Sequence, residues 1–128
     1  MAISYVVNQR VNPRDPQGPR KFYAMAKSTS EETTRKLATE ISKRTGLSVS
    51  DVIAVLEGFI DLIPERLIDG SIVRLGDFGS FNITLSSDGA DKAEDFTPTM
   101  IKGNNLNFRP GKIVEKVLST ADYKRISE

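Results

Sequence analysis

The period of the hydrophobic pattern changes near residue 70, and this change restricts the fold of the chain more than any other feature. Along residues 52–67, apolar side chains recur in steps of three and four. Along residues 71–85, apolar and polar side chains alternate. Steps of three and four place side chains on one face of a helix, whereas alternation is typical of a strand with one buried face. The sequence therefore predicts an α+β fold in which helices precede a sheet.

Two helices are predicted before this change. The first covers residues 33–46, where Gly46 is the residue type that commonly follows the last helical turn. The second begins at the capping-box pattern of residues 48–51, Ser-Val-Ser-Asp, and ends at residues 69–70, Asp-Gly. Because only a short turn separates the two helices, we expect an αα-hairpin whose apolar stripe needs a further surface to pack against.

Strands are predicted on both sides of the helices. Residues 3–11 and 20–27 are rich in β-branched and aromatic side chains and flank a loop with three prolines, so we expect a β-hairpin there. Residues 71–85 and 100–108 are predicted to form further strands, and residues 109–118 a last helix with an apolar face. The predicted order is two strands, two helices, three strands and one helix.

The sequence lacks both Cys and His, which excludes several kinds of functional site. Without Cys there is no disulfide, no thiolate nucleophile and no thiolate zinc site. Without His the commonest general base and the commonest metal ligand are absent. No spacing of carboxylates indicates a catalytic pair, so we expect no enzymatic activity, no cofactor, no metal and no small-molecule substrate.

The tripeptide Asp77-Phe78-Gly79 has the letters of the magnesium-binding motif of protein kinases. That motif acts together with a catalytic-loop Asp, a strand Lys and a glycine-rich nucleotide loop, and no segment of the sequence matches them. We therefore interpret residues 74–83 as a strand, a turn and a second strand. The glycines permit a tight backbone there, and the phenylalanines enter a core.

Charge and hydropathy indicate where the chain acts and how it is organised. The first residues lack the basic start and apolar run of a signal peptide, and no apolar run of about 18 residues occurs, so we expect a cytoplasmic protein without membrane contact. The net charge is only +1, yet residues 1–29 contain five cations and one anion, whereas residues 30–70 contain five cations and eight anions. We expect an N-terminal β-strand extension over residues 1–29 and one main domain over residues 30–128.

Two motifs in the second half of the chain, together with the order of the predicted elements, resemble the HU and integration host factor family of bacterial histone-like DNA-binding proteins. The first motif is Phe78-Gly79-Ser80-Phe81, with Asp77 in place of the family's first Gly, and the second is Phe108-Arg109-Pro110-Gly111-Lys112. The resemblance extends over roughly residues 33–118. It is closest to an extended variant of the family that has an added N-terminal segment.

The resemblance implies an obligate homodimer on double-stranded DNA. Two αα-hairpins would intertwine into a helical base, two sheets would form a saddle, and β-arms would reach around the minor groove. The cations expected on DNA phosphates are Arg109 and Lys112 first, then Arg14, Arg20, Lys21 and Lys27 of the extension, and then Arg74, Lys102 and Lys116. The aromatic side chains expected at the subunit interface, because one thin protomer cannot cover them, are Phe59, Phe78, Phe81 and Phe108.

The predicted arm, residues 82–107, departs from the family pattern. It contains four acidic residues against Lys92 and Lys102 and lacks the Arg-Asn-Pro tip that wedges between base pairs. We therefore expect architectural, weakly sequence-specific binding in the nucleoid, with affinity from contacts to backbone phosphates. The alternative is a protein-interaction module that keeps the dimeric fold and docks through the acidic arm or the N-terminal hairpin. The N-terminal cations also have a second interpretation, as charges that keep edge strands soluble.

Overall fold

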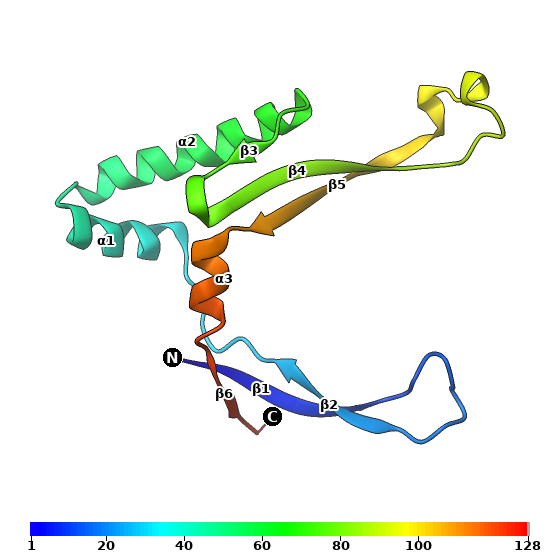
Figure 1. Cartoon of the computed structure of the whole chain (residues 1–128). Helices are drawn as coiled ribbons and strands as arrows, with labels where there is room; N and C mark the ends of the chain where they lie inside the picture. Colours follow the sequence, from blue (N-terminus) through cyan, green and yellow to red (C-terminus); the bar gives the residue numbers. More distant parts are fainter. Residues whose placement is uncertain (128) are drawn as a thin grey trace. The chain divides into compact units, whose positions relative to one another are not determined.

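The computed structural model describes residues 1–127 and divides the chain into two structural units (Figure 1). The larger unit is Thr34–Lys116. The smaller unit combines Met1–Thr33 with the C-terminal segment that begins at Val117. No helix within residues 1–127 is long and apolar enough to cross a membrane.

The larger unit begins with an αα-hairpin made of α1 (Thr34–Thr45) and α2 (Val49–Ile68). Gly46 follows α1 with a φ of 80°, a left-handed conformation that glycine adopts without strain. The Ser48 side chain accepts a hydrogen bond of 3.1 Å from the backbone N–H of Asp51 and so caps the start of α2. These are the boundaries that the sequence predicts, because helix ends are specified by local residues.

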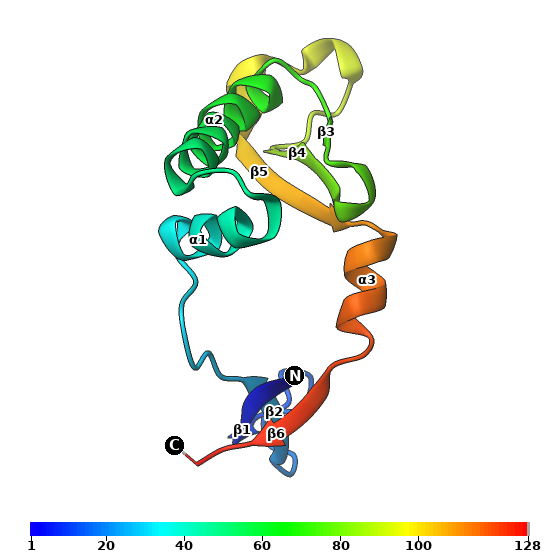
Figure 2. The ribbon, with the colours of Figure 1, turned by 90° about the vertical axis from the view of Figure 1, so that its left-hand side faces the viewer.

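An antiparallel sheet follows in the order β3-β4-β5, and the αα-hairpin lies beside its base in both views (Figures 1 and 2). Strands β4 and β5 continue beyond β3 as a long two-stranded arm. Short 3-10 turns connect β3 to β4 and form the tip of the arm. The bounds are β3 (Val73–Arg74), η1 (Gly76–Phe78), β4 (Gly79–Ser87), η2 (Ala93–Asp95), η3 (Pro98–Met100), β5 (Ile101–Pro110) and α3 (Lys112–Leu118).

The smaller unit is a three-stranded sheet in the order β2-β1-β6. Its central strand, β1 (Ala2–Arg10), pairs antiparallel with β2 (Lys21–Ala26) and parallel with β6 (Asp122–Arg125). The sequence predicts the β1–β2 hairpin but not β6. The sequence-based boundary between residues 29 and 30 grouped β6 with the main domain, whereas in the structure β6 pairs with Ala2–Tyr5.

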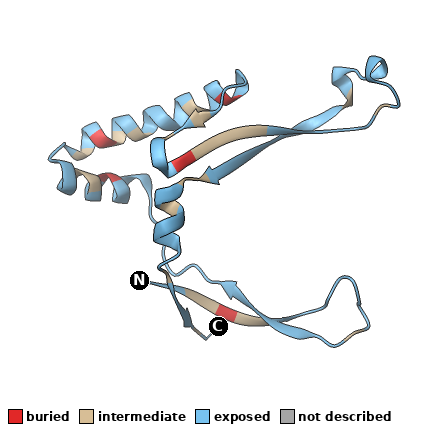
Figure 3. Ribbon diagram, in the orientation of Figure 1, coloured by how far each residue is buried: buried red, intermediate tan, exposed pale blue. Residues whose placement is uncertain are grey.

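Few apolar side chains are buried within the described residues (Figure 3). They are Val6 in the smaller unit and Ala38, Val52 and Leu67 in the larger unit. The accessible surface of the chain is 10858 Å². A compact monomer of the same mass exposes about 6,700 Å², and two separate compact bodies about 8,000 Å². The chain by itself therefore exposes far more surface than a stable monomer of its size.

Candidate nucleic-acid interface

The sheet β3-β4-β5 has one apolar face, because side chains alternate along each strand. On this face Phe81 lies opposite Phe108, and Ile83 lies opposite Leu106. The ring of Phe108 contacts two others, with centroids 4.9 Å from that of Phe81 and 5.4 Å from that of Phe78 in η1. Phe78 and Phe108 are nevertheless 51% and 40% exposed. The structure thus brings three of the four predicted interface phenylalanines into one cluster that solvent still reaches.

The fourth predicted interface residue, Phe59, lies on α2 and forms none of these ring contacts within the described part of the chain. It is 43% exposed. Its neighbours Ile60 and Leu62 are exposed as well. Helix α2 therefore presents an apolar surface to solvent in addition to the side that packs on α1.

The opposite face of the same sheet is polar and carries two arginines in one row. Ser80 of β4 pairs with Arg74 of β3 on one side and with Arg109 of β5 on the other. Both arginines are exposed, and neither forms an ion pair with any residue between 1 and 127. They line a hollow of about 360 Å³ together with Asn82 and Asn107. Two unpaired guanidinium groups on one face favour an anionic ligand, because guanidinium donors match phosphate geometry.

Uncharged hydrogen-bonding side chains extend this polar face along the arm. The amide of Asn107 donates to the hydroxyl of Thr84 at 2.9 Å, and the amide of Asn105 donates to the hydroxyl of Ser86 at 3.2 Å. Each amide keeps a second N–H and a carbonyl oxygen for an external partner. Sequence reasoning missed this polar stripe, which also includes Asn82. The sequence does contain a signal for this stripe, because every second residue from 82 to 86 and from 105 to 109 is polar, and residues at such spacing share one face of a strand.

Two glycines fix the base of the arm and with it the position of Arg109. Gly79 has a φ of 147°, and a Cβ there would lie 2.5 Å from the carbonyl oxygen of Arg109 and 2.7 Å from the Phe108 ring. Gly111 donates its backbone N–H to the carbonyl of Phe78 at 2.8 Å, and its own Cβ would collide with the backbone oxygen of Asp77. The tripeptide Asp77-Phe78-Gly79 thus belongs to a turn that lies against the start of α3. We call the close backbone approach at Gly79 and Gly111 the glycine clamp.

The other predicted DNA-binding cations that follow the αα-hairpin in the chain, Lys102, Lys112 and Lys116, lie on β5 and α3. Lys112 is the exposed first residue of α3, directly after the glycine clamp, and Lys116 lies near the other end of the same helix. Lys102 forms an ion pair of 3.0 Å with Asp88 near the arm tip. Its strand position is about 23 Å from Arg109. The structure therefore brings Arg74 and Arg109 together and separates Lys102 from them.

The predicted N-terminal cations belong to the smaller unit. Arg14 and Arg20 lie in the loop between β1 and β2, Lys21 begins β2, and Lys27 follows β2. All four are exposed. Within residues 1–127, no group of three or more His, Cys, Asp or Glu side chains is arranged to hold a metal ion.

The chain is similar to a known protein family in sequence and to a solved structure in fold. A family model described as "HU domain fused to wHTH, Ig, or Glycine-rich motif" matches residues 1–125, which include both structural units. A crystal structure of a candidate bacterial DNA-binding protein from Bacteroides vulgatus superposes with a TM-score of 0.66 at 11% sequence identity. The superposition covers 99% of this chain and 49% of that one, so this chain spans about half the length of its structural neighbour. No curated protein matches the sequence.

Proposed function

The chain belongs to the family of HU domains fused to a winged helix-turn-helix, an immunoglobulin or a glycine-rich motif, and from this we propose that it binds double-stranded DNA as a homodimer. The observation that carries the proposal is the division of the sheet β3-β4-β5 into two faces. One face is aromatic and aliphatic, and the other carries Arg74, Arg109 and a row of amides and hydroxyls. A sheet with such faces suits a protein partner on one side and a polar polyanion on the other.

The polar face supplies the DNA contacts in this proposal. Arg74, Arg109 and Lys112 neutralise backbone phosphates, which gives affinity at low salt and little sequence preference. The amides of Asn105 and Asn107 donate hydrogen bonds to sugar and phosphate oxygens or to acceptors in the minor groove. The resulting role is architectural, with the protein associated with DNA in the nucleoid.

A second copy of the chain covers the apolar face. The phenylalanine cluster borders this face, and a groove of about 530 Å³ lies between the end of α2 and the arm. Leu67, Ile68, Ile83 and Leu85 are among the residues that line the groove. Burying one large apolar side chain contributes about 1.5–3 kcal/mol, so a handful of these residues from each copy is sufficient to drive association.

The arm tip is excluded from the DNA contacts in this proposal. It carries Asp88, Asp91, Glu94 and Asp95, and the Lys102 ammonium group is paired with Asp88. Phosphates repel this cluster, and no Arg-Asn-Pro wedge is present to unstack bases. The same acidic tip favours the alternative function, a protein-interaction module that docks a basic partner while keeping the dimeric fold.

Salt-dependent DNA binding separates the two functions. Fluorescence anisotropy with a duplex of about 30 base pairs is measured at several salt concentrations, and log affinity is plotted against log salt. We expect steep salt dependence, and we expect Arg74→Ala/Arg109→Ala to lower the slope by about 2 per protomer. The control is Arg35→Ala/Lys43→Ala, which removes two exposed cations from α1. Absence of binding at low salt by a protein shown to be dimeric would reject DNA binding in favour of the interaction module.

A further inference from the structure

The β1–β2 hairpin places two cations directly opposite each other. Arg10, the last residue of β1, pairs with Lys21, the first residue of β2. Both side chains are exposed, and no carboxylate of the described chain forms an ion pair with either. Like charges at directly opposite positions of a ladder destabilise the pairing. An anion held between these two groups would remove this repulsion.

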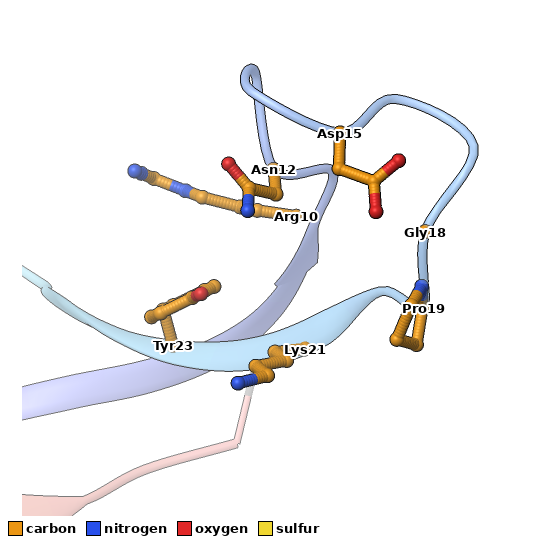
Figure 4. A pocket seen from close by; sticks show the side chains of 7 residues that line it. All are labelled: Arg10, Asn12, Asp15, Gly18, Pro19, Lys21 and Tyr23. Carbon is orange, nitrogen blue, oxygen red and sulfur yellow. The ribbon is translucent and has the colours of Figure 1, made fainter.

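A hollow of about 240 Å³ lies at this end of the hairpin (Figure 4). Arg10, Lys21 and Tyr23 contribute to it from the strands, and Asn12 and Asp15 contribute from the loop. Arg10, Lys21 and Tyr23 share one face, because Tyr23 lies opposite Asn8, two positions along the ladder. The face therefore offers a guanidinium group, an ammonium group, a phenol hydroxyl and an amide as hydrogen-bond donors.

The single carboxylate of the hairpin loop does not neutralise these cations. The carboxylate of Asp15 is turned toward Gly18, where any Cβ would collide with it. The backbone of the same residue closes two turns, donating to the carbonyl of Asn12 at 3.0 Å and accepting from the N–H of Gly18 at 3.0 Å. Asp15 thus holds the loop in shape and leaves Arg10 and Lys21 without a counter-ion inside the hairpin.

The loop between β1 and β2 is rich in proline, which restricts its backbone, and it contains two further cations, Arg14 and Arg20. Residues 11–20 include three prolines, and the backbone N–H of Arg14 donates to the side-chain oxygen of Asn12 at 3.0 Å. Prolines and closed turns reduce the entropy that a loop loses when it binds. Arg14 and Arg20 belong to this loop and are exposed, so they add positive charge to the same end of the hairpin.

We propose that this cationic end of the hairpin is a second phosphate-binding site for double-stranded DNA, distinct from the polar face of β3-β4-β5. The inference rests on the proposed function and adds a contact site to it. The two sites lie in different structural units of one chain. DNA held at one site raises the effective concentration of phosphate at the other, so two weak sites produce useful affinity without a fixed mutual geometry. The second site supplies cationic contacts that the acidic arm lacks.

The test uses Arg10→Gln/Lys21→Gln in the full chain, with Arg35→Gln/Lys43→Gln as a control that removes the same two charges from α1. We expect the hairpin variant to lower the salt slope of duplex binding by about 2 per protomer and to weaken binding at least about tenfold in about 0.1 M salt. The control is expected to match the wild type. Thermal unfolding without DNA checks folding, and the hairpin variant should be at least as stable as the wild type, because a like-charge pair has been removed.

Each failure has a distinct signature. Wild-type slope and affinity in the hairpin variant, together with weak binding by Arg74→Ala/Arg109→Ala, would overturn the second site and leave the proposed function standing. Absence of DNA binding by the wild type would overturn both. Lost affinity of the hairpin variant for a single strand of equal length, with unchanged affinity for the duplex, would overturn the assignment to double-stranded DNA.

Discussion

At the scale of single residues, two glycines connect the sequence motifs to the candidate site. Gly79 and Gly111 each lie where a side chain would meet the neighbouring backbone, at Arg109 and at Asp77. The motifs therefore need glycine because two segments approach closely, and the approach sets the direction in which β5 passes into α3. Arg109 and Lys112 flank this contact, so the clamp orients the cations that we assign to phosphate.

Alanine at Gly111 should destabilise the larger unit by more than about 2 kcal/mol, because its Cβ meets backbone that cannot move aside cheaply. Gly79→Ala should have a similar effect, because a Cβ there would lie 2.5 Å from the carbonyl oxygen of Arg109 and because the φ of 147° at Gly79 is rarely adopted by other residues. The control is Gly103→Ala in β5, where no atom lies within 4 Å of a Cβ. Urea unfolding followed by circular dichroism gives the three values. Equal stability of Gly111→Ala and Gly103→Ala would contradict the clamp.

The cap of α2 offers a second comparison between single residues. Ser48→Ala removes the hydrogen bond to the N–H of Asp51 and should cost about 1 kcal/mol of stability. Ser50→Ala, inside the first turn of the same helix, should change stability by no more than about 0.5 kcal/mol. The difference is measured by thermal unfolding of the two variants in parallel. Indistinguishable variants would mean that Ser48 does not determine the start of α2.

At the scale of elements, the sequence predicts features that depend on contacts between residues close together in the chain, and it misses features that depend on contacts between distant residues. The end of α1 and the start of α2 were predictable because Gly46 and Ser48 act on backbone groups a few residues away. Strand β6 was not, because its residues, Asp-Tyr-Lys-Arg, show no apolar alternation and it forms only by pairing with β1 at the other end of the chain. The pairing of Arg74 with Ser80 likewise depends on register, which sequence spacing alone does not give.

The dependence of the smaller unit on β6 can be measured directly. Truncation after Ala121 removes β6 and leaves the β1–β2 hairpin, and an isolated two-stranded hairpin is only marginally stable in water. We expect hydrogen exchange of the β1 amides to become fast while that of α1 and α2 stays slow. Truncation after Ile126 is the matched control, because the N–H of Ile126 still donates to the carbonyl of Tyr5. If the β1 amides remain protected after truncation at Ala121, β6 is not required for the stability of the smaller unit.

At the scale of the whole molecule, both units expose apolar side chains, and in the larger unit these lie apart from the unpaired arginines. In the larger unit, the apolar surface includes α2 and one face of the sheet β3-β4-β5, and Arg74 and Arg109 lie on the other face. In the smaller unit, Arg10 lies on the β1–β2 hairpin, whose strand β2 also exposes Phe22. In the proposed function, a second copy of the chain covers the apolar surface of the larger unit, and DNA phosphates neutralise the unpaired arginines. Association of two copies depends on protein concentration, whereas DNA binding depends on salt concentration, so the two proposed interactions can be measured separately.

Dimerisation predicts that the unfolding temperature rises with protein concentration, because dissociation of the folded dimer is coupled to unfolding. Phe59→Ser should weaken the dimer by about 3–6 kcal/mol, since each of two copies loses the burial of one large apolar side chain. Phe22→Ser is the control, because Phe22 is 66% exposed but lies in β2 of the smaller unit. Sedimentation equilibrium and thermal scans over a hundredfold range of concentration measure both effects. A wild-type chain that sediments as a monomer, with a concentration-independent unfolding temperature, would mean that the exposed surface of α2 is covered by something other than a second copy.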